Sequence, residues 1–324
     1  MKRILALHTG GTISMSQDEN GEVTPNSANP IASATGPLND DIELINEEVF
    51  NLPSPHITPK HMLKIKQRIK RAEDEGIDGV VVTHGTDTLE ETAYFLDLTL
   101  PNTIPVVMTG AMRSSNQIGS DGLYNFQSAV LVAATAEAYG KGVLVVMNDE
   151  IHTARYVTKT HTTNVDTFRT PTFGPIGLIV EHKAVFFQEL VQSEVCDIDQ
   201  VIDNVYLLEA YAGMDSFLFD AIDRPETKGL VLEGTGAGNV PPETLDGISK
   251  LLANDIPIVL VSRCYNGVAQ DIYGYEGGGI ELKKMGVTFC RGLNGPKARI
   301  KLLVGLSAGK TGADLVNFVS DAIS

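Results

Sequence analysis

The chain has 324 residues, of which 43% are hydrophobic and 20% charged, a balance typical of a globular protein with a large core. A formal net charge of −16, spread evenly along the chain, opposes binding to nucleic acid or to an anionic membrane, so neither partner is expected. The length exceeds that at which a single core usually stops growing, which favours two domains.

The first 190 residues alternate apolar strands with helical patterns, an order that predicts right-handed crossovers and a mainly parallel sheet. Strands are expected at four apolar runs, residues 4–7, 80–82, 105–108 and 143–147. Helices are expected from Thr58-Pro59, with Thr as the cap, from Thr88, which forms a capping-box pattern with Glu91, and over 123–139. Residues 15–37 lack periodicity and predict a mobile loop that acts as a lid.

A polar, acidic segment over residues 188–204 is interpreted as a linker between an N-terminal catalytic domain, 1–187, and a C-terminal domain, 205–324. In the second domain, the clearest strands are 229–232 and 256–261, and the clearest helices are 242–253 and 313–323. The predicted fold is therefore α/β. Its larger N-terminal domain has a mainly parallel, doubly wound sheet, and its C-terminal α/β domain is smaller.

The three cysteines, Cys196, Cys264 and Cys290, are odd in number and lack a C-x-x-C spacing, which indicates thiols in a reducing compartment. The first apolar run stops at His8, too early for a signal peptide, and no stretch approaches the length of a membrane span. The cytoplasm is the expected location.

Glycine-rich motifs elsewhere do not predict a cofactor site. Gly305-Leu-Ser-Ala-Gly309 fits the G-x-S-x-G pattern, but all seven histidines precede it, which excludes the chain order Ser, acid, His, so we interpret it as a structural turn. Gly234-Thr-Gly-Ala-Gly238 places its third glycine wrongly for a dinucleotide turn. The histidines show no metal-ligand spacing, so the expected site contains neither metal nor cofactor.

Two turns at strand ends carry hydroxyl groups and form the candidate site. The first is Thr9-Gly-Gly-Thr12 and the second is Thr83-His-Gly-Thr-Asp-Thr88. Because open α/β sheets bind ligands at the carboxyl ends of their strands, we interpret the pair as one active site.

Each turn offers groups that an amide hydrolase needs. Gly10 and Gly11 leave backbone N–H groups uncovered beside the Thr12 hydroxyl. Thr86 and Asp87 precede a helix N-terminus, whose N–H groups favour a bound carboxylate. The alternative for Asp87 is an ion pair with a substrate ammonium. Taken singly, such residues are more often turn or cap residues.

Seven stretches together resemble the bacterial L-asparaginases, most of all the cytoplasmic type I enzymes. They are His8-Thr-Gly-Gly-Thr-Ile-Ser14, Thr83-His-Gly-Thr-Asp-Thr88, Glu91-Thr-Ala-Tyr-Phe-Leu-Asp97, Val106-Val-Met-Thr-Gly-Ala-Met-Arg113, Gly142-Val-Leu-Val-Val-Met-Asn-Asp149, Val157-Thr-Lys-Thr160 and Gly295-Pro-Lys-Ala-Arg299. The resemblance spans almost the whole chain. It implies a cofactor-free amidohydrolase that converts L-asparagine to L-aspartate and ammonia.

The resemblance also implies roles for single residues. Thr12 attacks the side-chain amide and forms a β-aspartyl ester, and Lys159 lowers the cost of deprotonating Thr86 and helps to activate water in a cluster with Asp87. Which threonine reacts first stays open. The implied substrate contacts within the same subunit are Gly11, Ser54, Pro55, Asp87 and Ala111, with Ser54 on the α-carboxylate and the Ala111 backbone at the amide end.

The family completes its site with residues of a neighbouring subunit, which implies a homodimer or a homotetramer built as a dimer of dimers. The matching positions fall at Ala237, with Asn239 nearby, and around Asp271 to Tyr273. Two departures stand out: Pro55 replaces the usual Gln after Ser54, and no Tyr follows Thr12 in the loop where many members have one. The group that assists Thr12 therefore stays open.

Two other functions stay open as well. One is a glutaminase-asparaginase of relaxed specificity, or the related subunit of a tRNA amidotransferase. The other is a non-catalytic sensor that binds amino acids. The intact residues Thr12, Thr86, Asp87 and Lys159 argue against the sensor, because binding alone needs no cluster of hydroxyls and a lysine.

Overall fold

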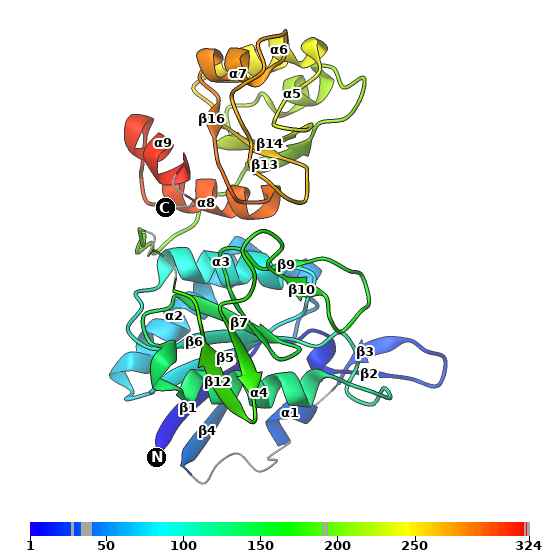
Figure 1. The fold of residues 1–324 in the computed structure, drawn as a ribbon, viewed down its shortest axis with the longest axis vertical. Helices are drawn as coiled ribbons and strands as arrows, with labels where there is room; N and C mark the ends of the chain where they lie inside the picture. The colour runs from blue at the N-terminus through cyan, green and yellow to red at the C-terminus, as the bar shows by residue number, and fades with distance from the viewer. Residues whose placement is uncertain (27–28, 34–40, 190, 192–193, 321, 323–324) are drawn as a thin grey trace. The chain divides into compact units, whose positions relative to one another are not determined.

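A computed structural model describes residues 1–26, 29–33, 41–189, 191, 194–320 and 322 (Figure 1). The chain divides into two compact units, Met1–Gln192 and Ser193–Ser324. The segment 188–204, interpreted above as a linker, includes the point of division.

The first unit is built on an eight-stranded sheet with the order β12-β11-β8-β7-β6-β5-β1-β4. The strands are β1 (Lys2–His8), β4 (Ile42–Glu48), β5 (Gly79–Thr83), β6 (Val106–Thr109), β7 (Val143–Met147), β8 (Glu150–Thr153), β11 (Gly177–Val180) and β12 (Lys183–Phe186). The five strands from β7 to β4 are parallel, and β8, β11 and β12 extend the sheet as antiparallel strands. The predicted mainly parallel sheet is confirmed.

Helices cover both faces of this sheet, with α3 (Leu89–Thr99) and α4 (Gly122–Ala134) on opposite sides in Figure 1. Every residue of β5 is buried, as expected of a parallel strand between two helical layers. Alternate strand residues pack with α4 in one core: Ile4, Ala6, Val81, Val107 and Leu144 against Phe126, Ala129, Val130 and Ala133. The unit is therefore doubly wound. The helix predicted from Thr58-Pro59 is α2 (Pro59–Asp74).

Two local predictions need correction. The helix expected over 123–139 ends with α4 at Ala134, because Thr135 is extended (ψ 133°) and donates its hydroxyl to the Leu131 carbonyl at 2.9 Å. The expected irregular loop begins instead with a hairpin of β2 (Met15–Gln17) and β3 (Val23–Pro25), followed by α1 (Pro30–Ser33). The Asp18 carboxylate shapes its turn by accepting from the Asn20 and Glu22 amides at 2.9 and 2.8 Å. Residues 27–28 and 34–37 of that loop lie outside the described residues.

The second unit has a four-stranded parallel sheet, ordered β13-β14-β15-β16, with helices on both faces (Figure 1). The strands are β13 (Val205–Glu209), β14 (Gly229–Gly234), β15 (Ile258–Ser262) and β16 (Thr288–Phe289), and the helices are α5 (Phe217–Ile222), α6 (Leu245–Ala253), α7 (Gly279–Met285), α8 (Gly295–Ser307) and α9 (Gly312–Ser320). The predicted smaller α/β domain is confirmed. The stretch 305–309 is not a separate turn, since its first three residues end α8.

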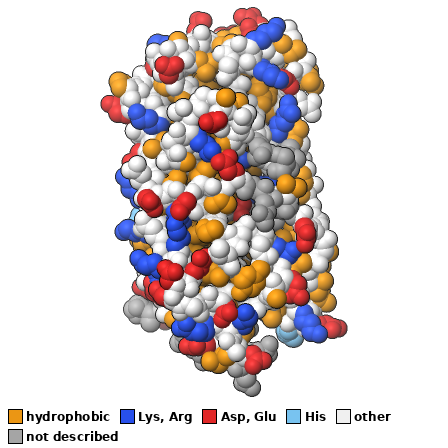
Figure 2. All heavy atoms as spheres, turned by 90° about the vertical axis from the view of Figure 1, so that its left-hand side faces the viewer, with side chains coloured by type: hydrophobic (Ala, Val, Ile, Leu, Met, Phe, Trp, Pro, Cys, Tyr) orange, Lys and Arg blue, Asp and Glu red, His pale blue; other side chains and the backbone are white. Residues whose placement is uncertain are grey.

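Acidic and basic side chains are interspersed on the face that Figure 2 presents, so the negative charge is distributed and not gathered there in one patch. None of the helices formed by the described residues has the length and apolar character needed to cross a bilayer.

Candidate active site

Three neighbouring strands end at the same edge of the first unit's sheet. In the parallel register, His8 of β1 lies opposite Thr83 of β5, and Thr83 lies opposite Thr109 of β6. The segments that follow are the first turn (residues 9–12), the second turn (84–88) and the third turn (110–113). All three turns lie at the edge of the sheet formed by the carboxyl ends of its parallel strands, which is where such sheets bind ligands.

The first and second turns touch through their backbones. A Cβ atom on Gly11 would lie 2.2 Å from the Gly85 Cα, and Gly11 has a φ of +85°. A Cβ on Gly10 would lie 2.4 Å from the Leu52 amide nitrogen. Both positions therefore require glycine. This contact places partly exposed Thr12, the first residue of a short 3-10 helix (Thr12–Ser14), next to the second turn.

Lys159 joins two of the polar residues of the second turn. Its Nζ donates to Thr86 Oγ1 at 3.0 Å and pairs with Asp87 Oδ1 at 2.7 Å. Lys159 lies on β9 (Thr158–Lys159), which a two-residue antiparallel partner, β10 (Phe168–Arg169), holds in place. Because Thr86 is buried, with 6% of its surface exposed, a cation at this distance stabilises an alkoxide on it.

Ser54 is bound to the second turn at two points. Its Oγ accepts from the Asp87 amide at 3.1 Å, which leaves its own proton for a ligand oxygen, and its carbonyl accepts from Thr88 Oγ1 at 2.8 Å. The capping box predicted for Thr88 and Glu91 is wrong in its first half, because this hydroxyl caps no helix and bonds Ser54 instead. Pro55 is exposed beside Ser54 and offers no N–H.

The third turn packs on the second. A Cβ on Gly110 would lie 2.7 Å from the His84 carbonyl oxygen and 3.1 Å from Thr86 Cγ2. Ala111, which follows, is 1% exposed, so its side chain is buried in the turn. The structure thus brings Ser54, Thr86, Asp87 and Lys159 into one cluster, with the turns of Gly11 and Ala111 on either side.

Two family models match almost the whole chain. Residues 3–192 match the model "Asparaginase, N-terminal", and residues 204–318 match "Glutaminase/Asparaginase C-terminal domain". The chain belongs to the asparaginase family. The resemblance drawn from the seven stretches is confirmed.

Relatives of known description agree with this membership. The L-asparaginase of Bacillus licheniformis is 38% identical, with 96% of this chain and 97% of the relative covered. A glutaminase-asparaginase of Pseudomonas aeruginosa is 32% identical, with 82% and 77% covered. The crystal structure of a probable cytoplasmic L-asparaginase from Campylobacter jejuni matches with a TM-score of 0.86 at 33% identity, covering 100% of this chain and 99% of that one.

His84, which the sequence reasoning did not single out, shapes the second turn of this asparaginase-family site. Its ring is fully buried, and Nδ1 lies 2.7 Å from the Gly85 carbonyl, which only accepts, so Nδ1 carries the proton. Nε2 then accepts from Thr92 Oγ1 at 3.0 Å. Burial lowers the pKa of His84 to about 4, so the ring is neutral at physiological pH. The sequence signal that could have identified this residue is the histidine within the stretch Thr83-His-Gly-Thr-Asp87.

This neutral histidine predicts a loss of stability in acid. Between the unfolded-state pKa near 6.5 and the folded-state pKa of about 4, the unfolded chain binds a proton that the folded chain does not. We expect His84 to reduce the free energy of unfolding by roughly 3 kcal/mol as the pH falls through this range. Denaturant unfolding of wild type and His84→Gln at several pH values measures this, because the variant lacks that part of the slope. If the free energy of unfolding fell with pH equally steeply in both proteins, the prediction would be contradicted.

Asn239 and Tyr273 belong to the second unit. Asn239 is 9% exposed, and its Oδ1 accepts from the Gly279 amide at 3.3 Å, so part of its side chain holds its own loop. Tyr273 is 41% exposed, and its ring lies 5.4 Å from that of Tyr275. Their role in a neighbouring subunit's site stays a prediction.

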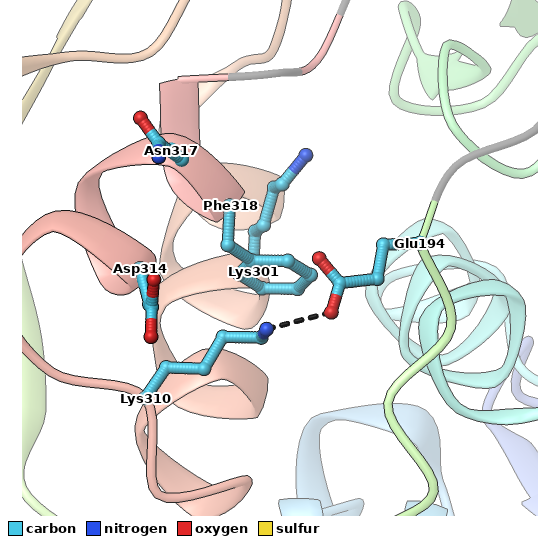
Figure 3. Close-up of a pocket in the computed structure, with 6 residues that line it drawn as sticks. All are labelled: Glu194, Lys301, Lys310, Asp314, Asn317 and Phe318. Carbon is cyan, nitrogen blue, oxygen red and sulfur yellow. Dashed lines mark hydrogen bonds and ion pairs between the residues drawn. The ribbon is translucent and has the colours of Figure 1, made fainter.

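The second unit also has a pocket of about 360 Å³, lined by Glu194, Lys301, Lys310, Asp314, Asn317 and Phe318 (Figure 3). Lys310 pairs with Glu194 at 2.6 Å, and the Nζ atoms of Lys301 and Lys310 lie 5.1 and 5.2 Å from the Phe318 ring centre. Two acids balance the two lysines, and none of the site residues predicted above lines this pocket.

Proposed function

We propose that this chain is an L-asparaginase, a hydrolase that converts L-asparagine to L-aspartate and ammonia through a threonine nucleophile. The observation that carries the proposal is the cluster of Thr86, Asp87 and Lys159 at the strand ends, in contact with the turn of Thr12, in a chain of the asparaginase family. Binding alone does not need a lysine that stabilises a buried alkoxide.

The reaction proceeds in two steps. Thr12 Oγ1 bonds to the side-chain amide carbon of asparagine, the C–N bond breaks, and ammonia leaves with the proton that the hydroxyl gave up. Water then attacks the β-aspartyl ester, and aspartate leaves as the Thr12 hydroxyl is restored. Lys159 favours deprotonated Thr86, which orients and activates the water.

The residues around the two threonines bind the amino-acid end of the substrate. Ser54 donates its proton to the α-carboxylate, since its oxygen already accepts from the Asp87 amide. The Asp87 carboxylate pairs with the α-ammonium, and its side chain is 59% exposed and therefore accessible. Gly11 and Ala111 line the side-chain amide through their backbones, and Pro55 borders Ser54.

The active form is a homodimer, or a homotetramer made of two dimers, in which Asn239 and Tyr273 reach a neighbouring subunit's site. Half-exposed tyrosines in the second unit support this assembly, namely Tyr211, Tyr265, Tyr273 and Tyr275. The proposed location is the cytoplasm, as in the description of the Campylobacter jejuni protein, although one relative, from Haemophilus influenzae, is described as periplasmic. Neither nucleic acid nor membrane is a proposed partner.

A glutaminase-asparaginase is the second candidate. It is favoured by the Pseudomonas aeruginosa relative and by Pro55, which cannot make the contact of a glutamine side chain with the substrate carboxylate. Glutamine is longer than asparagine by one methylene, so discrimination depends on the space at the amide end.

Ammonia release from asparagine and from glutamine, over a wide concentration range and with no partner present, tests the proposal. We expect asparagine to be favoured in kcat/KM by about 10- to 200-fold, the range that one methylene provides. Equal values would favour the second candidate. Tight asparagine binding by calorimetry with no ammonia released would overturn the proposal in favour of a sensor.

A further inference from the structure

An acid that precedes α4 and an amide on α4 fix the backbone of the third turn. Asp121 accepts from the Met112 and Arg113 amides, each with an oxygen at 3.0 Å. Asn125, which is 2% exposed, donates from Nδ2 to the Gly110 carbonyl and to Asp121 Oδ2, both at 3.1 Å. Its Oδ1 accepts from the Asn148 amide at 3.1 Å. The peptide groups on both sides of Ala111 are therefore anchored.

The Asp121 carboxylate does not cap its own helix. It precedes the first residue of α4, a position where Asp usually accepts from the helix's first N–H groups, yet its side chain makes no such bond. Its carboxylate is directed to the third turn instead. A purely local capping role does not account for this residue.

These anchors set the direction of one carbonyl. In a trans peptide the N–H and C=O groups point in opposite directions, so holding the Met112 N–H on Asp121 turns the Ala111 carbonyl away from Asp121. A hydrogen bond from that N–H to a charged carboxylate also polarises the peptide and makes its carbonyl a stronger acceptor.

We propose that Asp121 is a positioning residue that aims and polarises the Ala111 carbonyl toward the leaving nitrogen of the substrate amide. The inference rests on the proposed function, in which Ala111 lines that end of the substrate. The nitrogen gains positive charge as it takes up a proton to leave, so a polarised carbonyl binds it more tightly in the transition state than in the ground state. Asn125 supports the same geometry through the Gly110 carbonyl.

The variant Asp121→Asn tests this, because it keeps the shape and removes the charge. We expect kcat for asparagine to fall by about 10- to 100-fold, with a smaller change in KM. Inhibition by L-aspartate, which has no leaving nitrogen, should stay within about twofold of wild type. The fall in kcat should be smaller with L-aspartate β-hydroxamate as the substrate than with asparagine. Its leaving group, hydroxylamine, is less basic than ammonia and gains less positive charge.

Asp149→Asn is the matched control. Asp149 accepts from Tyr124 of α4 at 2.6 Å, so the substitution removes a charge beside α4 but leaves the third turn unchanged. Its kcat should therefore equal that of wild type.

Unchanged kcat in Asp121→Asn, or a loss of aspartate affinity equal to the loss of kcat, would overturn the inference. If Asp121→Asn does not fold, Asn125→Ser is the second variant, because it removes the bonds of the Asn125 amide to the Gly110 carbonyl, to Asp121 and to the Asn148 amide. It must show the same result, a fall in kcat with unchanged inhibition by aspartate. A wild-type protein that binds aspartate but releases no ammonia would instead refute the proposed function.

Discussion

Replacing Thr12 with alanine is expected to lower kcat for ammonia release from asparagine by about 10⁴-fold or more, because the covalent step loses its nucleophile. The fold should persist. The substitution removes a hydroxyl from a partly exposed side chain and leaves Gly11, whose backbone contact with Gly85 joins the two turns, unchanged. Steady-state ammonia release with purified protein measures the effect, and thermal unfolding checks that the variant is folded.

Thr12→Ser is the control for this prediction. Serine restores a hydroxyl at the same position, so ammonia release should return to within about tenfold of wild type. If Thr12→Ala instead kept near wild-type turnover, Thr12 would not be the nucleophile, and Thr86, the other threonine of the pair, would take its place in the mechanism.

The strands that carry the site are predictable because their signal is local. Residues 80–82 form a continuous apolar run, and β5 is buried along its whole length, so the sequence pattern and the packing agree. The order of the strands in the sheet is not predictable from this local signal. That β5 lies between β1 and β6, which brings three turns to one edge, depends on crossovers whose packing is decided by the whole unit.

The contacts of the site are less predictable because they join distant parts of the chain. Lys159 meets Thr86 across 73 positions, and only the family resemblance indicated that pair in advance. Thr88 satisfies the local pattern for a capping box, yet its hydroxyl bonds the Ser54 carbonyl, 34 residues away. Asp121 likewise occupies a cap position and serves the third turn. A local pattern gives no information about a competing partner brought close by the tertiary fold.

The hairpin after Thr12 illustrates the same limit. Residues 15–25 have the composition of a loop, but Asn116 accepts from the Gln17 amide and donates to the Gln17 carbonyl, both at 2.8 Å. Ser115 adds a bond from its Oγ to the Met15 carbonyl at 2.9 Å. These side chains lie about a hundred residues further along the chain, so composition near residue 15 could not reveal them.

Gly11→Ala is expected to damage both the stability and the site. At a φ of +85° an alanine is strained, and its Cβ would overlap the Gly85 Cα at 2.2 Å, so the two turns must separate. We expect a loss of about 3 kcal/mol or more in the free energy of unfolding. The resulting displacement of Thr12 from the second turn should lower kcat/KM for asparagine by at least about 100-fold.

Gly140→Ala separates backbone strain from the contact between the turns. Gly140 has a similar φ of +74°, but a Cβ at this position would have no atom within 4 Å. That control should cost only about 1 kcal/mol and leave kcat/KM unchanged, as measured by denaturant unfolding and ammonia release. Equal losses in the two variants would show that strain at φ alone, and not the contact between the turns, makes glycine necessary at position 11.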